Sequence, residues 1–248
     1  RYAICNGGNN PIVAIGKKFD SASFDSLIFV EDSEVKSFYS ATFFYSYFRK
    51  LQIPPQLTNL NFNLCYCVER LVEIEVSLNN KLFTVIDKTF LVKKKVTKNL
   101  TFVFYRRDVE NVKILSHIKT INSNAFNKCN KLISITFDQE FLLESFENDA
   151  ISSNSALKSI VFPPSLKYII DGININYMLQ YVEFQSEYFE LKHTCFHCCC
   201  DFMVISFPNA KKLKFNDNST RLFQKGTKLK VKQGAELIGN EFSKSTNF

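Results

Sequence analysis

A spaced apolar pattern repeats along the whole chain and predicts its architecture. In each copy, one apolar residue is followed three and five positions later by two more, as in Leu132-Ile135-Phe137. Alternation of this kind is typical of a short strand, in which the residues two and four after the start face outward. The starts recur about every 23 residues, with one longer interval after Leu71, and they fall at Phe24, Phe48, Leu71, Val109, Leu132, Leu157, Leu179, Phe202 and Gly226.

The remainder of each unit also repeats. Pro54, Pro163 and Pro208 share one position after the strand, where ladder hydrogen bonding can end. Apolar pairs follow at Leu57 and Leu60, Ile118 and Ile121, Leu166 and Ile169, and Tyr188 and Leu191, and later positions hold Phe126 with Cys129 and Phe196 with Cys199. We expect the pairs to form a second extended segment and the stretch around Ala125 to form a short helical turn.

A unit of about 23 residues cannot bury an apolar face alone, but stacked units form one continuous core. The sequence therefore predicts a single α/β solenoid over residues 1–248, with a parallel β-sheet on the concave face and short helical turns and extended segments on the other side. The long interval contains β-rich stretches at 82–86, 89–92 and 100–105, so we expect an elongated unit with a β-hairpin insertion over 77–108. Residues 1–23 are expected to be a degenerate first unit or cap, and 232–248 a C-terminal cap or truncated end.

These positions resemble the BspA-like leucine-rich repeats of the Treponema pallidum type. That family's repeat is similar to L-x-x-I-x-(I/F)-P-x-x-(V/L)-x-x-I-x-x-x-A-F-x-x-C, which residues 109–132, 157–169 and 48–60 match. The A-F-x-x-C step separates it from ribonuclease-inhibitor-like repeats with their Asn ladder. Ile173 and Asn176 stand where Phe and Cys are expected, which predicts an irregular turn.

The resemblance implies a leucine-rich-repeat solenoid that acts as a non-enzymatic protein–protein interaction module. Members of the family are typically surface or secreted antigens implicated in adhesion to host proteins and cells, so a host or extracellular-matrix protein is the implied partner. An intracellular leucine-rich-repeat scaffold is the alternative, since many members have no leader or anchor.

The outward strand positions form two columns of mixed charge that include exposed apolar residues. This mixture suits protein recognition better than binding to a phosphate backbone, so we predict a protein partner and no nucleic acid. The residues expected to bind that partner are Lys50, Glu73, Glu75, Lys113, Tyr181, Glu183 and Lys228.

Composition supports a folded chain with a large core. The chain has 248 residues, 46% of them hydrophobic, with 26 Phe and no Trp, and we expect most of the Phe residues to face inward. The net charge of +7 is common in soluble proteins, and the basic run Lys93-Lys94-Lys95 is expected to be a solvated turn. No window approaches eighteen uncharged apolar residues, so we expect no membrane span in this chain. The family resemblance implies a location at the cell surface or in secreted form, with the cytoplasm as the alternative.

One stretch contains residues that could carry chemistry. His193-x-Cys195-x-His197-Cys198-Cys199-Cys200 has the donor types of a zinc site, although the spacing is poor for tetrahedral coordination. Cys199 shares its position in the repeat with Cys129, which favours a buried structural role. We therefore predict no catalytic residue, metal ligand or cofactor; the alternative is a zinc- or thiol-dependent protein centred on residues 193–200.

Overall fold

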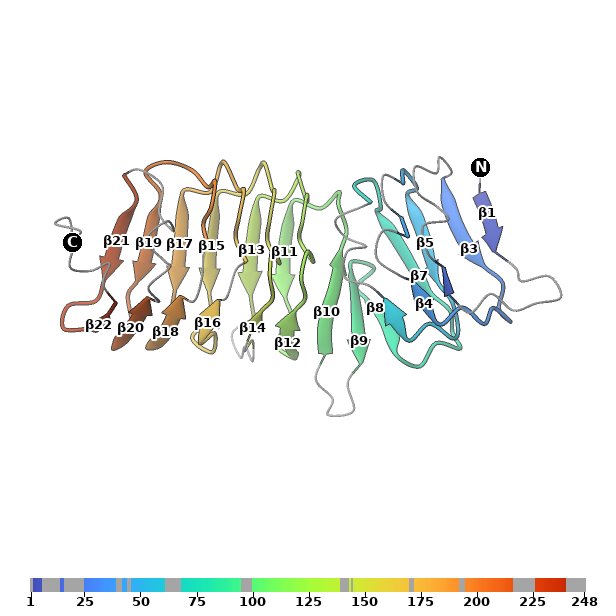
Figure 1. The fold of residues 1–248 in the computed structure, drawn as a ribbon, viewed down its shortest axis with the longest axis horizontal. Coiled ribbons are helices and arrows are strands. Elements are labelled where there is room, and N and C mark those ends of the chain that lie inside the picture. The colour runs from blue at the N-terminus through green and yellow to red at the C-terminus, as the bar shows by residue number, and fades with distance from the viewer. Residues whose placement is uncertain are drawn as a thin grey trace. The chain divides into compact units, whose positions relative to one another are not determined.

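The computed structural model describes residues 2–5, 14–15, 25–38, 42–43, 46–60, 68–94, 100–138, 143, 145–169, 172–191, 195–215 and 226–239. Within these ranges the chain forms β-strands joined by turns, and no helix is present. The chain divides into two compact units, Arg1–Arg107 and Asp108–Phe248, which are described separately (Figure 1). Each of the nine strand segments predicted from the apolar pattern carries a four-residue strand. That the two units form a single solenoid stays a prediction.

The first unit contains two parallel sheets with apolar side chains between them. The larger sheet has the order β1-β3-β5-β7, and the smaller sheet has the order β2-β4-β6. Inward residues such as Leu27, Leu51 and Phe38 are buried, and the rings of Phe29 and Phe38 lie 5.6 Å apart. The strand bounds are β1 (Tyr2–Cys5), β3 (Ser26–Phe29), β5 (Lys50–Ile53) and β7 (Glu73–Val76), and β2 (Ala14–Ile15), β4 (Ser37–Phe38) and β6 (Asn59–Leu60).

The insertion predicted in the long interval is present in the first unit as three antiparallel strands: β8 (Phe83–Ile86), β9 (Phe90–Lys94) and β10 (Leu100–Tyr105). Asp87, Lys88 and Thr89 connect β8 to β9, and Asp87 and Lys88 have φ values of 50° and 54°, which suit a tight hairpin turn. Lys93 and Lys94 lie in β9 and not in a turn, so the expectation was wrong for these two, and Lys95 lies outside the described residues. The reason is tertiary, because Lys93 Nζ donates to the carbonyl oxygen of Thr58 at 3.2 Å and lies 5.8 Å from the centre of the Phe83 ring.

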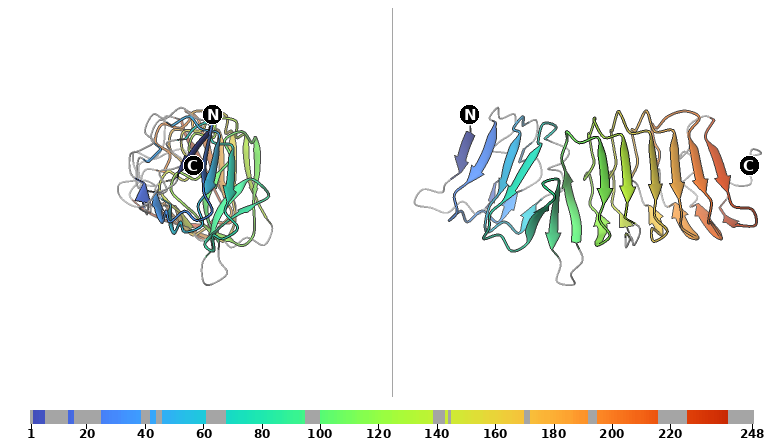
Figure 2. Two further views of the ribbon diagram at one scale, coloured as in Figure 1. Left: turned by 90° about the vertical axis from the view of Figure 1, so that its right-hand side faces the viewer. Right: turned by 180° about the vertical axis from the view of Figure 1, so that it is seen from behind.

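The second unit is a β-solenoid with two parallel sheets (Figure 2). Its first sheet consists of β11 (Asn111–Ile114), β13 (Ser134–Phe137), β15 (Ser159–Phe162), β17 (Tyr181–Phe184), β19 (Val204–Phe207) and β21 (Lys228–Val231). Its second sheet contains β12 (Ile118–Ile121), β14 (Ser145–Phe146), β16 (Tyr168–Ile169), β18 (Tyr188–Leu191), β20 (Lys212–Phe215) and β22 (Glu236–Ile238). The second extended segment predicted for each repeat is therefore a strand that pairs with its counterpart one repeat away.

Stacked phenylalanines fill the space between these two sheets. The rings of Phe162 and Phe184 lie 5.0 Å apart and nearly parallel, and those of Phe184 and Phe207 lie 5.2 Å apart. Aromatic pairs in such geometry contribute about 0.5–1.5 kcal/mol beyond their area burial. The predicted inward position of these residues is confirmed.

Two aromatic residues that were expected to face inward face solvent instead. Phe202 is 69% exposed because its φ of 61° turns the chain there, and Met203 occupies the buried position. Tyr188 is 59% exposed because β18 alternates strictly, so that Phe189 and Leu191 are its buried residues.

The helical turn expected around Ala125 is not confirmed, because these residues form turns. Asn124 and Lys128 have φ values of 61° and 56°, which an α-helix excludes. The amide groups of Phe126 and Lys128 donate to carbonyl oxygens of the next repeat, those of Ala150 and Ser152, at 2.8 and 3.0 Å. Hydrogen bonds between repeats thus replace the bonds within the segment that a helix needs, and the α/β class is not confirmed for the described residues.

The turn at Ile173 and Asn176 was expected to be irregular, and residues 172–176 lack the turn that residues 123–128, 148–151 and 195–198 form. Asn176 is fully buried, and its Nδ2 donates to the carbonyl oxygen of Ile151 at 2.9 Å while its Oδ1 accepts from the amide of Asn154 at 3.0 Å. Asn154 Oδ1 accepts in turn from the amide of Cys129 at 2.7 Å, and Cys199 Sγ donates to the carbonyl oxygen of Ile173 at 3.0 Å. Cys129, Asn154, Asn176 and Cys199 thus occupy one buried polar ladder, because Asn and Cys side chains can both bond to the backbone of a neighbouring repeat.

Candidate protein-binding face

The predicted outward columns lie in register in both units. In the first unit Lys50 pairs with Ser26 and Glu73, and Gln52 pairs with Glu75. In the second unit one column runs through Asn111, Ser134, Ser159, Tyr181, Val204 and Lys228. Residues at matching positions of parallel strands project from the same face of a sheet. We call the outer side of β1-β3-β5-β7 the first-unit face, and the outer side of β11, β13, β15, β17, β19 and β21 the second-unit face.

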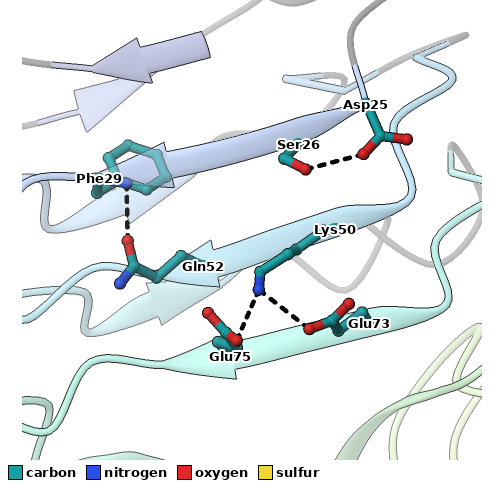
Figure 3. A network of polar contacts seen from close by, with 7 residues as sticks. All are labelled: Asp25, Ser26, Phe29, Lys50, Gln52, Glu73 and Glu75. Atoms are coloured by element: carbon teal, nitrogen blue, oxygen red, sulfur yellow. Dashed lines mark hydrogen bonds and ion pairs between the residues drawn. The ribbon is translucent and has the colours of Figure 1, made fainter. Parts of the chain in front are cut away.

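The first-unit face is organised around Lys50 (Figure 3). Lys50 Nζ donates to Glu75 Oε1 at 2.6 Å and to Glu73 Oε1 at 3.0 Å, and these bonds raise the pKa of Lys50 above its usual value. Gln52 Oε1 accepts from the backbone amide of Phe29 at 2.9 Å, which fixes this side chain across two strands. One ammonium group between two half-exposed carboxylates leaves this patch with a net negative charge.

The second-unit face is mostly uncharged where it begins. Ser134 Oγ donates to Asn111 Oδ1 at 2.7 Å, and Lys113 Nζ lies 2.8 Å from Asp138 Oδ1. Val161 is 38% exposed in the neighbouring column. Small polar side chains, one ion pair and one exposed valine thus make up this part of the face.

Farther along, this face carries a fixed tyrosine and then two lysines. The Tyr181 hydroxyl donates to the Glu183 carboxylate, which raises the pKa of Tyr181, and Gln185 Nε2 donates to the other Glu183 oxygen at 3.2 Å. Lys228 and Lys230 are exposed on β21, and none of the ion pairs found among the described residues involves them. Of the seven predicted binding residues, Lys50, Glu73 and Glu75 thus lie on the first-unit face and Lys113, Tyr181, Glu183 and Lys228 on the second-unit face.

The cysteine-rich stretch divides into buried and exposed thiols. Cys195 and Cys199 are buried, and burial raises the pKa of Cys199 to about 12, so its thiol is protonated at neutral pH. Cys198 is partly exposed, with its Sγ 3.2 Å from His197 Nδ1. His193 lies outside the described residues, and within them no three His, Cys, Asp or Glu side chains form a group that could hold a metal ion. The predicted burial of Cys199 is confirmed.

The structure also has a groove that sequence analysis missed. It lies on the outer side of the second sheet, where Tyr168, Tyr188, Glu190, Lys212 and Lys214 line it. The signal was present in the alternating segments 188–191 and 212–215, but the apolar pair assigned to the first of them placed Tyr188 inward. Only the observed alternation in β18 shows which side chains face out.

The chain matches a known family over more than half of its length. The model of the BspA type leucine rich repeat region matches residues 97–230 in six copies. The chain belongs to the BspA-type leucine-rich-repeat family. This family and its fold are typically non-enzymatic and mediate protein interaction. No curated protein sequence matches this BspA-type chain.

Solved structures of bacterial leucine-rich proteins share the fold of this BspA-type chain. A leucine rich cell surface protein from Faecalibacterium prausnitzii is 17% identical, with a TM-score of 0.62 over 93% of this chain and 59% of its own. The pneumococcal vaccine antigen PcpA is 18% identical, with a TM-score of 0.63 over 94% of this chain and 58% of its own. A leucine-rich repeat protein from Eubacterium ventriosum is 18% identical, with a TM-score of 0.57 over 93% and 72%. The chain thus spans less than two thirds of the length of the first two.

The described part of the chain was also searched for helices that could cross a membrane. No helix there has the length and hydropathy that a span requires.

Proposed function

We propose that this BspA-type chain is a protein-binding module displayed at the cell surface or secreted, and that it binds a host or extracellular-matrix protein through the second-unit face. The family and the cell-surface proteins among its structural neighbours support this proposal. The observation that carries it is Tyr181, which is held by Glu183 between exposed Val161 and the exposed lysines of β21.

The chemistry of this face fits a protein partner of moderate affinity. A half-buried tyrosine with a fixed hydroxyl loses little side-chain entropy on binding and offers both an apolar ring and a polar edge. Interface tyrosines of this kind are frequent hot spots, and a stable complex buries about 800 Å² on each partner. Lys228 and Lys230, at the border of the same face, would then guide an acidic partner surface and raise the association rate.

The first-unit face would bind differently. Lys50 is already held by two carboxylates, so a partner there meets exposed Glu73 and Glu75 and not a free cation. We propose that this face contributes to selecting the partner through its negative charge, since unmatched charge across an interface costs affinity.

Capture of purified extracellular-matrix proteins by the immobilised full chain tests the proposal. We expect Tyr181→Ala to weaken capture roughly tenfold, as for a hot-spot residue. Tyr181→Phe keeps the ring and should retain most of the binding, and Tyr188→Ala, which removes a tyrosine from the second sheet, should leave capture unchanged.

Equal capture by wild type and Tyr181→Ala would contradict binding at this face.

Labelling of intact cells with a reagent that does not cross membranes tests the location. Protection of the chain in intact cells, with labelling after lysis, would favour the intracellular scaffold over a surface antigen.

A further inference from the structure

The groove on the second sheet of the second unit has the size of a ligand site. Its volume is about 540 Å³, and it is formed by side chains of β16, β18 and β20 and the residues just before these strands. Sites for small ligands commonly measure 300–1,000 Å³. The groove lies on the opposite sheet from the second-unit face, so it is a separate surface of the same unit.

Two tyrosines provide its apolar surface. Tyr188 is 59% exposed although it is the first residue of a strand that is paired on both sides, and Tyr168 on the neighbouring strand is paired with Glu190. Phe189, beneath Tyr188, is buried in the core. The backbone that carries the two rings is therefore held by the sheet, and the rings offer apolar area at a small cost in side-chain entropy.

Most of the charges in and around the groove neutralise one another, and Lys167 is the lining lysine for which the described residues show no ion pair. Lys214 Nζ lies 3.1 Å from Glu190 Oε1, and Lys212 Nζ lies 3.3 Å from Glu236 Oε1. A cationic ligand, or an anionic ligand with more than one charge, would have to displace one of these partners. A neutral ligand with many hydroxyl groups would leave the ion pairs intact. An ammonium group has three N–H donors and a carboxylate has several acceptor sites, so each can bond to a hydroxyl as well as to its ion-pair partner.

The backbone of the groove offers no attachment for an extended peptide. β18 pairs with β16 on one side and with β20 on the other, so its ladder groups are engaged. Strand addition needs a free sheet edge, which the centre of this groove does not provide. Recognition must therefore come from side chains.

We propose that this groove binds a neutral oligosaccharide. The C–H face of a sugar ring packs on the Tyr188 and Tyr168 rings, while its hydroxyls donate to Glu190 and accept from Lys212 and Lys214. This site is additional to protein binding at the second-unit face.

Calorimetric titration of the full chain with four soluble neutral hexasaccharides tests the proposal: cellohexaose, maltohexaose, xylohexaose and chitohexaose. We expect at least one to bind with a dissociation constant in the millimolar range or below, and Tyr188→Ala to weaken it roughly tenfold through loss of ring stacking. Tyr188→Phe should retain binding. Tyr181→Ala is the matched control, because it removes a tyrosine from the opposite sheet, and it should not change the affinity.

Three results would overturn the proposal. The first is no measurable binding of any of the four hexasaccharides, and the second is equal binding by wild type and Tyr188→Ala when circular dichroism shows both folded. The third is binding of a tyrosine-rich or proline-rich peptide that Tyr188→Ala abolishes, since this would assign the groove to peptides. Each result is independent of protein capture, in which Tyr181→Ala is the informative variant and Tyr188→Ala the control.

Discussion

The two units use the same strand register but present different charge on the outer faces of their sheets. On the first-unit face, Lys50 forms ion pairs with Glu73 and Glu75 on the next strand, so its charge is neutralised within the protein. On the second-unit face, Lys228 and Lys230 are exposed with no ion pair among the described residues. Because the inward positions are restricted by packing and the outward ones are not, units with the same core can present opposite charge.

The apolar core should stabilise both units in the same way, and truncating a core side chain should have the largest effect on the free energy of unfolding. Leu51 and Leu157 are fully buried at equivalent strand positions. We expect Leu51→Ala and Leu157→Ala each to cost about 2–5 kcal/mol of unfolding free energy, through lost transfer energy and a cavity. Hydrogen exchange resolved along the chain measures the loss in each unit, and Ser159→Ala, an outward change, should cost less than about 0.5 kcal/mol. Equal losses for Leu157→Ala and Ser159→Ala would mean that the register is wrong.

The buried polar ladder of the second unit should give an intermediate effect. Asn176→Ala leaves the carbonyl of Ile151 and the amide of Asn154 without their side-chain partner in the core, which costs about 1–3 kcal/mol. Asn176→Cys restores the residue type that the repeat uses at Cys129 and Cys199, and urea unfolding should show a smaller loss for it than for Asn176→Ala. Asn130→Ala, at an exposed position one residue after Cys129, is the control and should be near neutral. A larger loss for the Cys variant than for the Ala variant would contradict this role.

The charge difference between the faces should give the smallest effect on stability. Lys50→Met removes a half-exposed ion-paired cation and should cost less than ~1 kcal/mol, with the cost decreasing in high salt. Because its bonds to Glu75 and Glu73 raise the pKa of Lys50 above its ordinary value, the stability that they contribute is present below the unfolded pKa and is lost as the pH rises through the higher folded pKa. Thermal unfolding at neutral and at alkaline pH measures this, with Lys228→Met as the control that should change nothing. A cost of Lys50→Met that persists unchanged at alkaline pH would show that packing of the lysine stem, and not its charge, stabilises the face.

Much of the fold could be predicted because the repeat supplies the same information many times. The strand segments, most of the inward residues of the first sheets and the antiparallel insertion are confirmed, with Phe202 as an exception. The turns were predicted less well. The spacing of Ala125, Phe126 and Cys129 fits a helix, and it fits equally well a series of turns whose amide groups bond to the next repeat. The sequence does not distinguish the two, because those bonding partners lie about 25 residues away along the chain.

The candidate site was predictable to the same degree. The outward columns followed from strand alternation, and their register is as expected. The groove was missed because Tyr188 was grouped with Leu191, three positions away. Residues at this spacing are both buried at Ile118 and Ile121, but β18 alternates strictly, so only Leu191 of its pair is buried. A difference of one residue moves a side chain to the other face of a strand.

By itself, the sequence determined the repeat, the phenylalanine core and the family, because each of these is set by residues that recur at a fixed spacing. Tertiary structure decided what single side chains do: it exposed Phe202, placed Asn176 in the buried ladder, held Tyr181 on Glu183 and opened the groove beside Tyr188. The bonds of Asn176 and the groove depend on residues that stacking brings from neighbouring repeats, and a one-dimensional pattern does not contain those contacts.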